Sequence, residues 1–139
     1  HAHNLAFADH WGTAPQAPAP WQDHWTARAN RMDLSTLALG GDGTVLAYVL
    51  AGQWVERELY VNLVGTVPEA RGRGLAAACL ARTLALAAAG GDFDRADLDV
   101  DSESPTGATR LYERLGFTVK KTFAAMQRDA PPAWPARPA

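Results

Sequence analysis

The sequence predicts a mixed α/β (α+β) fold in which helices flank a single sheet. Its 139 residues, 47% of them hydrophobic, are enough to bury one core of ordinary domain size. Short β-prone runs separated by glycine clusters fill the middle of the chain, and a run rich in alanine and leucine follows them. Strands that alternate with helices in this way are typical of one sheet covered by helices.

The first half of the chain predicts two short helices and three strands. Because proline cannot continue a helix, a proline-rich stretch separates a helix at Asn4–Trp11 from a second at Trp21–Arg31. The strands are expected at three β-prone runs: Thr36–Leu39, Thr44–Ala51 and Leu59–Val67. A Gly/Asp cluster between the first two supplies the positive φ of a hairpin turn. Pro68 ends the third, since proline cannot donate to a sheet ladder.

Two later segments carry a clear pattern. Arg71–Ala89 indicates a glycine-rich turn that opens a long Ala/Leu helix, which Gly90 and Gly91 end. In Ala96–Asp101 apolar residues alternate with aspartates, which indicates a strand with one apolar and one acidic face. The single cysteine, Cys79, lies among apolar residues of the long helix, so we expect a buried structural thiol.

The C-terminal part predicts one more helix and two strands. Ser104 and Pro105 are typical of a helix N-terminus, and Gly116 of a helix end. Two β-prone runs complete the pattern as two strands or as one bent strand: Phe117–Thr122 and Phe123–Arg128. The proline-rich residues 130–139 are expected to form a tail outside the core.

Charge and composition argue against several classes of partner. Lys+Arg 13 and Asp+Glu 15 give a net charge of -2, which does not suit a protein that holds nucleic acid or a membrane surface by positive charge. No apolar run of the sequence approaches the ~20 residues of a membrane-spanning helix, and we expect a cytoplasmic protein. The four histidines have neither cysteine partners nor a ligand spacing, so no metal site is expected.

The most informative segment joins the third strand to the long helix and runs from Val64 to Ala76. Glycines at the mouth of a helix let the backbone approach a ligand, and the unpaired amides and the helix dipole favour an anion such as a diphosphate. A Walker loop is excluded because Gly-Lys-Ser/Thr is absent, and the glycine spacing excludes a dinucleotide fingerprint.

Two motifs of the chain resemble those of the Gcn5-related N-acetyltransferase (GNAT) superfamily. The run Arg-Gly-Arg-Gly-Leu-Ala at 71–76 is similar to the family's Arg/Gln-x-x-Gly-x-Gly/Ala signature, and Leu-Tyr-Glu-Arg-Leu-Gly-Phe at 111–117 resembles its Leu-Tyr-x-x-x-Gly-Phe motif. The resemblance covers Ser35 to Arg128 and implies a mixed, mostly antiparallel sheet with splayed central strands. The chain looks most similar to the tandem mycothiol synthase-like acetyltransferases.

The resemblance implies transfer of acetyl from acetyl-CoA to a primary amine of a small molecule or peptide, by direct attack in a ternary complex. Tyr112 would be the general acid that protonates the departing CoA thiolate. Gly65 suits a bulge in a strand whose edge the pantetheine arm extends. The residues implied to bind acetyl-CoA are Val64, Gly65, Thr66, Arg71, Gly72, Arg73, Gly74, Leu75, Ala76, Ala77 and Ser104.

Two points stay open at the level of sequence. Ser104 stands where many family members carry Asn, which motivates an alternative: a catalytically degenerate domain that binds acyl-CoA or supports an active partner. The base that deprotonates the amine is Glu58, Asp99 or Glu103, unless water relays the proton.

Residues 1–129 are expected to form one acetyltransferase domain that lacks the family's first strand, as in the C-terminal half of a tandem protein. A second copy of the chain and a tandem partner domain are the protein partners left open.

Overall fold

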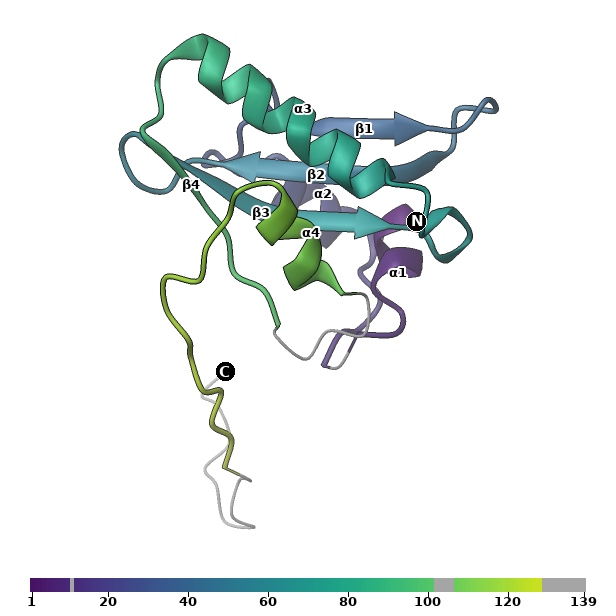
Figure 1. Cartoon of the computed structure of the whole chain (residues 1–139). Helices are drawn as coiled ribbons and strands as arrows, with labels where there is room; N and C mark the ends of the chain where they lie inside the picture. The colour runs from purple at the N-terminus through teal and green to yellow at the C-terminus, as the bar shows by residue number, and fades with distance from the viewer. Residues whose placement is uncertain (11, 102–106, 129–139) are drawn as a thin grey trace.

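The structure is a computed structural model, and it describes residues 1–10, 12–101 and 107–128. Within these residues the strands form one sheet in the order β1-β2-β3-β4 (Figure 1). Their bounds are β1 (Thr36–Leu39), β2 (Val45–Gly52), β3 (Glu58–Thr66) and β4 (Arg95–Asp97). The pairs β1–β2 and β2–β3 are antiparallel, whereas β3 and β4 run parallel. The sheet is therefore mixed and mostly antiparallel, as predicted.

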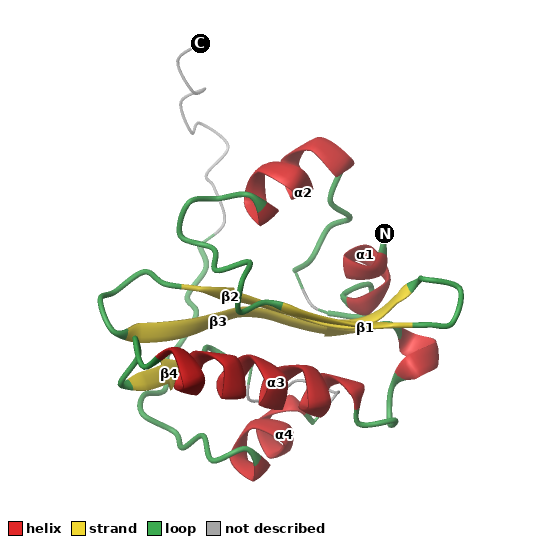
Figure 2. Ribbon diagram, turned by 90° about the horizontal axis from the view of Figure 1, so that it is seen from above, coloured by secondary structure: helices red, strands yellow, loops and turns green. Residues whose placement is uncertain are grey.

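Helices cover both faces of this sheet. Their bounds are α1 (Ala2–Ala6), α2 (Pro18–Trp25), the 3-10 helix η1 (Pro68–Ala70), α3 (Leu75–Gly90) and α4 (Ala108–Arg114). Seen from above, α1 and α2 lie on one face, and α3 and α4 lie on the other (Figure 2). The predicted fold class, a sheet flanked by helices, is confirmed.

The main core lies between α3 and the sheet. Two clusters of buried side chains fill it: Ala47, Val49, Val61, Cys79 and Leu80 in one, and Leu34, Ala51, Leu59 and Ala87 in the other. The fully buried Thr83 of α3 reaches Thr36 of β1 at 3.0 Å between hydroxyl oxygens, and Thr36 donates to the Cys79 carbonyl at 2.9 Å. The prediction that Cys79 is buried is confirmed.

The long helix and its stop agree with the sequence. α3 ends at Gly90, and Gly91 follows it with a φ of +71°, the left-handed conformation that glycine adopts at helix ends.

The first N-terminal helix is shorter than predicted. α1 ends at Ala6, and its last turn is followed by Phe7 in a non-helical conformation. The Thr13 hydroxyl donates to the carbonyls of Phe7 at 2.7 Å and of His10 at 2.9 Å. These bonds stabilise a turn where a longer helix would run. Trp11, the predicted end of this helix, lies outside the described residues.

The second N-terminal helix is shifted toward the N-terminus of its predicted range. α2 begins at Pro18, because proline fits the first helical turn, where no intrahelical acceptor is needed. It ends at Trp25, where the Asn30 side-chain amide donates to the carbonyls of His24 at 2.6 Å and Trp25 at 2.9 Å. The predicted continuation to Arg31 was wrong, because Asn30 caps the helix from outside.

The C-terminal strands differ from prediction. β4 covers Arg95–Asp97 instead of Ala96–Asp101, and none of the described residues from Phe117 to Arg128 belongs to a strand. Val119 and Phe123 have β-prone side chains but are 75% and 74% exposed, so they bury no apolar face against the sheet. A β-prone run without a paired neighbour gains no ladder hydrogen bonds, and the two predicted strands were wrong.

The second motif lies on α4, as predicted. Gly107 precedes the helix with a φ of +66°, and Gly116 ends it with a φ of +90°. The Gly116 amide donates to the Glu113 carbonyl at 3.0 Å, which closes the last turn. The predicted start at Ser104 and Pro105 lies outside the described residues.

The bulge of β3 lies at Asn62 and not at Gly65. Leu50 pairs with Leu63 and Ala51 with Val61, so Asn62 is the extra residue. Gly65 instead pairs with Tyr48 across the strands, and a Cβ on Gly65 would overlap the Tyr48 ring and reach 2.8 Å from its Cζ. Glycine is required at position 65 because the buried Tyr48 ring lies against its Cα.

We expect Gly65→Ala to lower the free energy of unfolding by about 1–3 kcal/mol, because the added methyl group overpacks the contact with Tyr48. Urea unfolding followed by circular dichroism measures this loss. Gly41→Ala is the matched control, since a Cβ at Gly41 meets no atom within 4 Å. Equal stability of the Gly65→Ala variant and the wild type would contradict the packing argument.

Candidate active site

The turn between β3 and α3 has a backbone that glycine adopts readily. Gly72 and Gly74 have φ values of +72° and +75°, and a Cβ built on either one meets no heavy atom within 4 Å. Glycine serves here for its backbone conformation and not for close packing. The turn leads directly into Leu75, the first residue of α3.

Backbone amides at this turn are free to bind an anion. Among the described residues, no amide from Gly72 to Ala77 donates to a backbone carbonyl, whereas the Ala78 amide donates to the Gly74 carbonyl at 3.0 Å. These amides lie at the positive end of the α3 dipole. Successive free N–H groups at a helix N-terminus fit the oxygens of a diphosphate.

The two arginines of the turn have different partners. Arg71 donates to both carboxylate oxygens of Asp9, at 2.6 and 3.1 Å, and to the Ala6 carbonyl at 3.0 Å. These hydrogen bonds hold the pKa of Asp9 below its ordinary value. Arg73 is exposed, and the described part of the chain offers it no ion pair. Arg71 therefore joins the turn to the N-terminal segment, and Arg73 carries the exposed positive charge.

The central strands β3 and β4 splay apart before β3 reaches this turn. β4 pairs with Glu58, Leu59 and Tyr60 of β3, and the ladder between the described strands ends there although β3 continues to Thr66. The rest of β3 remains paired with β2 on its other edge. The backbone from residue 61 to 66, which includes the predicted Val64, Gly65 and Thr66, therefore has one open edge that an extended ligand can join.

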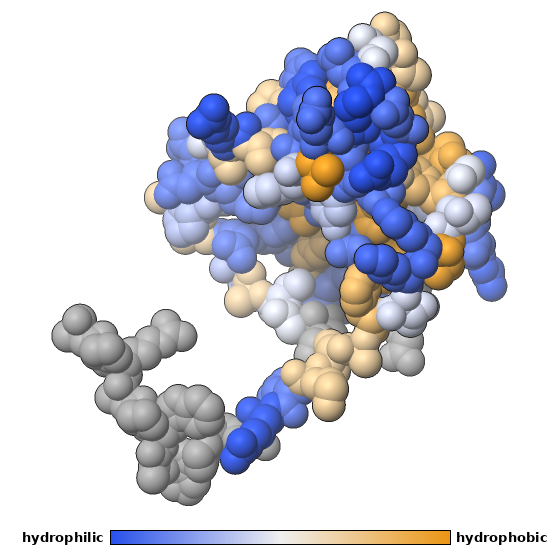
Figure 3. All heavy atoms as spheres, turned by 90° about the vertical axis from the view of Figure 1, so that its left-hand side faces the viewer, coloured by the Kyte–Doolittle hydropathy of each residue, from blue (hydrophilic) through white to orange (hydrophobic). Residues whose placement is uncertain are grey.

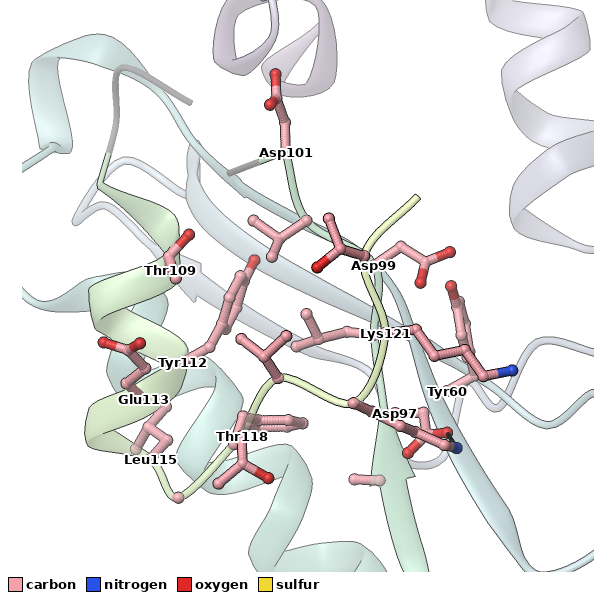
Figure 4. Close-up of a pocket in the computed structure, with 18 of the residues that line it drawn as sticks. Tyr60, Asp97, Asp99, Asp101, Thr109, Tyr112, Glu113, Leu115, Thr118 and Lys121 are labelled. Carbon is pink, nitrogen blue, oxygen red and sulfur yellow. Dashed lines mark hydrogen bonds and ion pairs between the residues drawn. The ribbon is translucent and has the colours of Figure 1, made fainter. Parts of the chain in front are cut away.

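A cavity of about 850 Å³ lies where this split begins, and Tyr60 is the residue of β3 that lines it. Tyr60 comes from β3, Asp97 and Asp99 come from β4 and the residues after it, Tyr112 comes from α4, and Lys121 comes from the following segment (Figure 4). The split thus brings together side chains from widely separated parts of the sequence.

Tyr112 is held by packing on the α3 side of the sheet. Its ring meets Phe117 edge-on, with centroids 6.0 Å apart and planes at 68°, and it packs against the buried cluster around Leu80. Burial raises the pKa of Tyr112, so the phenol keeps its proton at neutral pH. A protonated hydroxyl beside the split can act as an acid.

Tyr60 and Asp99 form a second polar group of the cavity. Figure 4 shows their side chains pointing toward each other on the side of the cavity opposite Tyr112. Burial, followed by a hydrogen bond with Asp99 and the negative charges nearby, raises the pKa of Tyr60 to about 12. The Tyr60 hydroxyl is therefore a hydrogen-bond donor to the Asp99 carboxylate.

The other predicted base candidates are placed differently. Glu58 is buried and accepts hydrogen bonds from Arg95, one of them at 2.8 Å, so its carboxylate is already paired. Arg57 and Asp94 form a further ion pair at 2.6 Å at this end of the sheet, and the surface there is mostly hydrophilic (Figure 3). Glu103, like the predicted cofactor ligand Ser104, lies outside the described residues.

Two polar residues of β3 were missed by sequence reasoning. Tyr60 lines the cavity, and the bulged Asn62 accepts a hydrogen bond from the Trp54 indole at 2.9 Å and donates one to Asn30 at 2.9 Å. Glu58, Tyr60 and Asn62 alternate with the buried Leu59 and Val61, and this period of two was the signal that could have placed them on one face.

Comparison with solved structures places this geometry among acetyltransferases. A GCN5-related N-acetyltransferase from Sphaerobacter thermophilus is 32% identical with a TM-score of 0.69, over 86% of this chain and 36% of that chain. A candidate acetyltransferase from Pyrococcus furiosus matches at 16% identity and a TM-score of 0.67, over 91% and 89% of the two chains. An aminoglycoside N-acetyltransferase in complex with CoA matches at 17% identity and a TM-score of 0.55, over 69% and 75%.

The described residues contain no helix long and apolar enough to cross a membrane. No curated protein matches the sequence significantly.

The model of the acetyltransferase (GNAT) family matches residues 3–117, which include both sequence motifs, the whole described sheet and the open edge of β3. The chain therefore belongs to the acetyltransferase (GNAT) family.

Proposed function

We propose that the protein transfers the acetyl group of acetyl-CoA to a primary amine of a small molecule or peptide, by direct attack in a ternary complex. The observation that carries this proposal is the position of the split. It begins after Tyr60 and Asp97, exposes one edge of β3 up to Thr66, where the chain continues toward the anion-binding turn, and has the Tyr112 side chain beside it. A long thioester with a diphosphate at one end can span the anion-binding turn, the open edge of β3 and the Tyr112 hydroxyl.

The turn before α3 would bind the diphosphate of acetyl-CoA. The hydrogen bonds would come from the free backbone amides of residues 72–77, which are Gly72, Arg73, Gly74, Leu75, Ala76 and Ala77. The exposed Arg73 side chain adds a positive charge. Arg71 contributes by holding the turn against Asp9 and the Ala6 carbonyl.

The open edge of β3 would bind the pantetheine arm. Val64, Gly65 and Thr66 offer backbone groups there, and the amide groups of the arm can pair with them like an added strand. A free amide near the Asn62 bulge is suited to hold the thioester oxygen as it becomes an oxyanion. The reacting carbonyl would then lie in the cavity.

Tyr112 would donate its proton to the thiolate that leaves the acetyl group. The raised pKa keeps the phenol protonated, so its hydroxyl can donate a hydrogen bond and a proton to the sulfur as negative charge develops there. The helix packing described above fixes the ring, so the hydroxyl needs no large rearrangement.

A second candidate function is a catalytically degenerate domain that binds acyl-CoA or supports a partner. The Arg71–Asp9 ion pair favours this alternative, because it takes one of the two arginines of the turn away from the anion site. A tandem arrangement like that of the mycothiol synthase group, and a cytoplasmic location, remain predictions. The chain spans 36% of the Sphaerobacter protein.

Calorimetry with acetyl-CoA and an assay of CoA release over a panel of primary amines separate the two functions. The proposed enzyme binds acetyl-CoA and releases CoA only when an amine is present. Binding without turnover on any amine of the panel would favour the degenerate domain.

We expect Gly74→Ala to weaken acetyl-CoA binding about tenfold or more, because the turn can no longer direct its amides without strain. Gly91→Ala is the matched control, since Gly91 has nearly the same φ, +71° against +75°, at the other end of α3. Both variants should lose similar stability, but only the first should lose affinity in calorimetry. Equal affinity losses would contradict the role of the turn.

We expect Tyr112→Phe to lower turnover by about 10²–10⁴, while acetyl-CoA affinity is retained, because only the proton donor is removed. Stopped-time assays of CoA release measure the first quantity and calorimetry the second. Tyr48→Phe serves as control: it removes a buried hydroxyl that bonds the His3 ring at 2.6 Å, outside the split. Wild-type turnover of Tyr112→Phe would remove the proposed role.

The pH dependence of turnover should show the raised pKa of Tyr112. The acid form is active, so turnover is retained while the phenol is protonated and is lost as the pH rises through its pKa. That loss is expected above the ordinary tyrosine value of 10.0. The residual turnover of Tyr112→Phe should lack this alkaline limb, and a limb that persists in the variant would assign it to another group.

A further inference from the structure

We propose that Asp99 binds the ammonium group of the acceptor and takes its proton, and that Tyr60 is the positioning residue for Asp99. This inference rests on the proposed acetyl transfer. It assigns a base, which the sequence leaves open among several carboxylates and water.

The position of Asp99 in the split carries the assignment. The β3–β4 ladder ends at the pair Tyr60–Asp97, and Asp99 follows two residues later, where the chain has left β3. Asp99 and Tyr112 both line the cavity, and they come from opposite sides of it (Figure 4). A thioester lying against the open edge of β3 would therefore have its proton donor on one side and a carboxylate on the other.

Two neighbouring carboxylates, those of Glu58 and Asp97, already have cationic partners within the protein. The Glu58 carboxylate accepts hydrogen bonds from the Arg95 guanidinium. The Asp97 carboxylate lies 2.7 Å from the Lys120 ammonium nitrogen and 3.9 Å from Nε of Arg95. For Asp99, no basic side chain of the described ranges comes within ion-pair distance. A cationic amine in the cavity would therefore find in Asp99 a negative charge with no internal counter-ion.

Tyr60 fixes the orientation of this carboxylate. Its hydroxyl lies toward Asp99 and keeps its proton well above neutral pH, so it remains a donor to one carboxylate oxygen. The other oxygen then faces an incoming amine. Tyr60 is the last residue of β3 that pairs with β4, so the sheet itself holds this donor in place.

The protons balance over the reaction. The ammonium first gives one proton to Asp99, which passes it to solvent, and the neutral amine attacks the thioester carbonyl. As the N–C bond forms and the C–S bond breaks, sulfur takes the Tyr112 proton. The second nitrogen proton goes to Asp99 and returns through water to the Tyr112 oxygen. One proton is released for each ammonium and thioester converted to an amide and a thiol.

The test compares wild type, Asp99→Asn and Asp97→Asn with acetyl-CoA and a panel of primary amines. We expect Asp99→Asn to lower kcat/KM by about 10²–10³, with acetyl-CoA affinity unchanged in calorimetry. Asp97→Asn removes a carboxylate from the same stretch, one that already has a cation, and should change kcat/KM by no more than about fivefold. Asp99 is exposed, Asp97 is half-buried, and neither belongs to the buried core, so both variants should fold.

Two further variants separate chemistry from structure. Asp99→Ala should regain turnover when formate is added, because formate can accept the proton in the space left by the side chain. Tyr60→Phe should lower kcat about tenfold in the wild-type background and cause no further loss in Asp99→Asn, as expected for residues that act as one unit.

The outcomes distinguish this inference from the function on which it rests. If the wild type acetylates an amine and Asp99→Asn does so equally well, the assignment of Asp99 is wrong and the acetyltransferase function stands. The same conclusion follows if Asp97→Asn loses as much turnover as Asp99→Asn. If wild type neither binds acetyl-CoA nor turns over any amine, the proposed function fails and the role of Asp99 fails with it.

Discussion

The parallel pairing of β3 with β4 stops after Tyr60 and Asp97, and the candidate site depends on that stop. Ion pairs hold the closed end: Arg95 binds Glu58, and Arg57 binds Asp94. Single exposed ion pairs are weak, but here they act on strands that are already hydrogen-bonded, and the Asp94 amide adds a bond of 2.9 Å to the Arg57 carbonyl. The result is a firmly closed end and an open edge on the same strand.

Packing on both faces holds the open part of β3 in place. Leu98, Tyr112 and Phe117 pack from the α3 side against the buried cluster around Leu80. From the α1 side the Tyr48 ring lies against the Cα of Gly65. β3 therefore does not need a partner on its free edge to keep its shape, because both faces are filled and β2 satisfies the other edge. An edge that is ordered without a partner is preorganised for an extended ligand.

The parts of the fold that follow from local chemistry could be predicted from sequence. Gly91 and Gly116 end helices because glycine adopts positive φ at low cost, and the turn at Gly72 and Gly74 follows the same rule. These features need only a few neighbouring residues. The two motifs therefore indicated the anion-binding turn and α4 correctly, although they lie far apart in the chain.

Features that depend on distant contacts could not be predicted in this way. The bulge at Asn62 is set by the register between β2 and β3, and Gly65 is explained by a ring on another strand. Phe117–Arg128 has β-prone residues, but a strand requires an edge long enough to pair with, and β4 has three residues. Tyr60 lies in the site because the pairing of β3 with β4 ends there. The residues next to Tyr60 in the sequence do not determine where that pairing ends.

Arg71 shows how a motif residue can act by position and not by charge. The family signature admits Arg or Gln here, and both carry N–H groups that can donate to a backbone carbonyl. In this chain Arg71 donates to the Ala6 carbonyl and also pairs with Asp9, so its charge is balanced within the protein. The bond shared by Arg and Gln is the one that ties the turn to α1. Binding of a diphosphate would then depend mainly on the amides of the turn, whose direction Arg71 maintains, and Asp9 is the feature that makes arginine the better residue here.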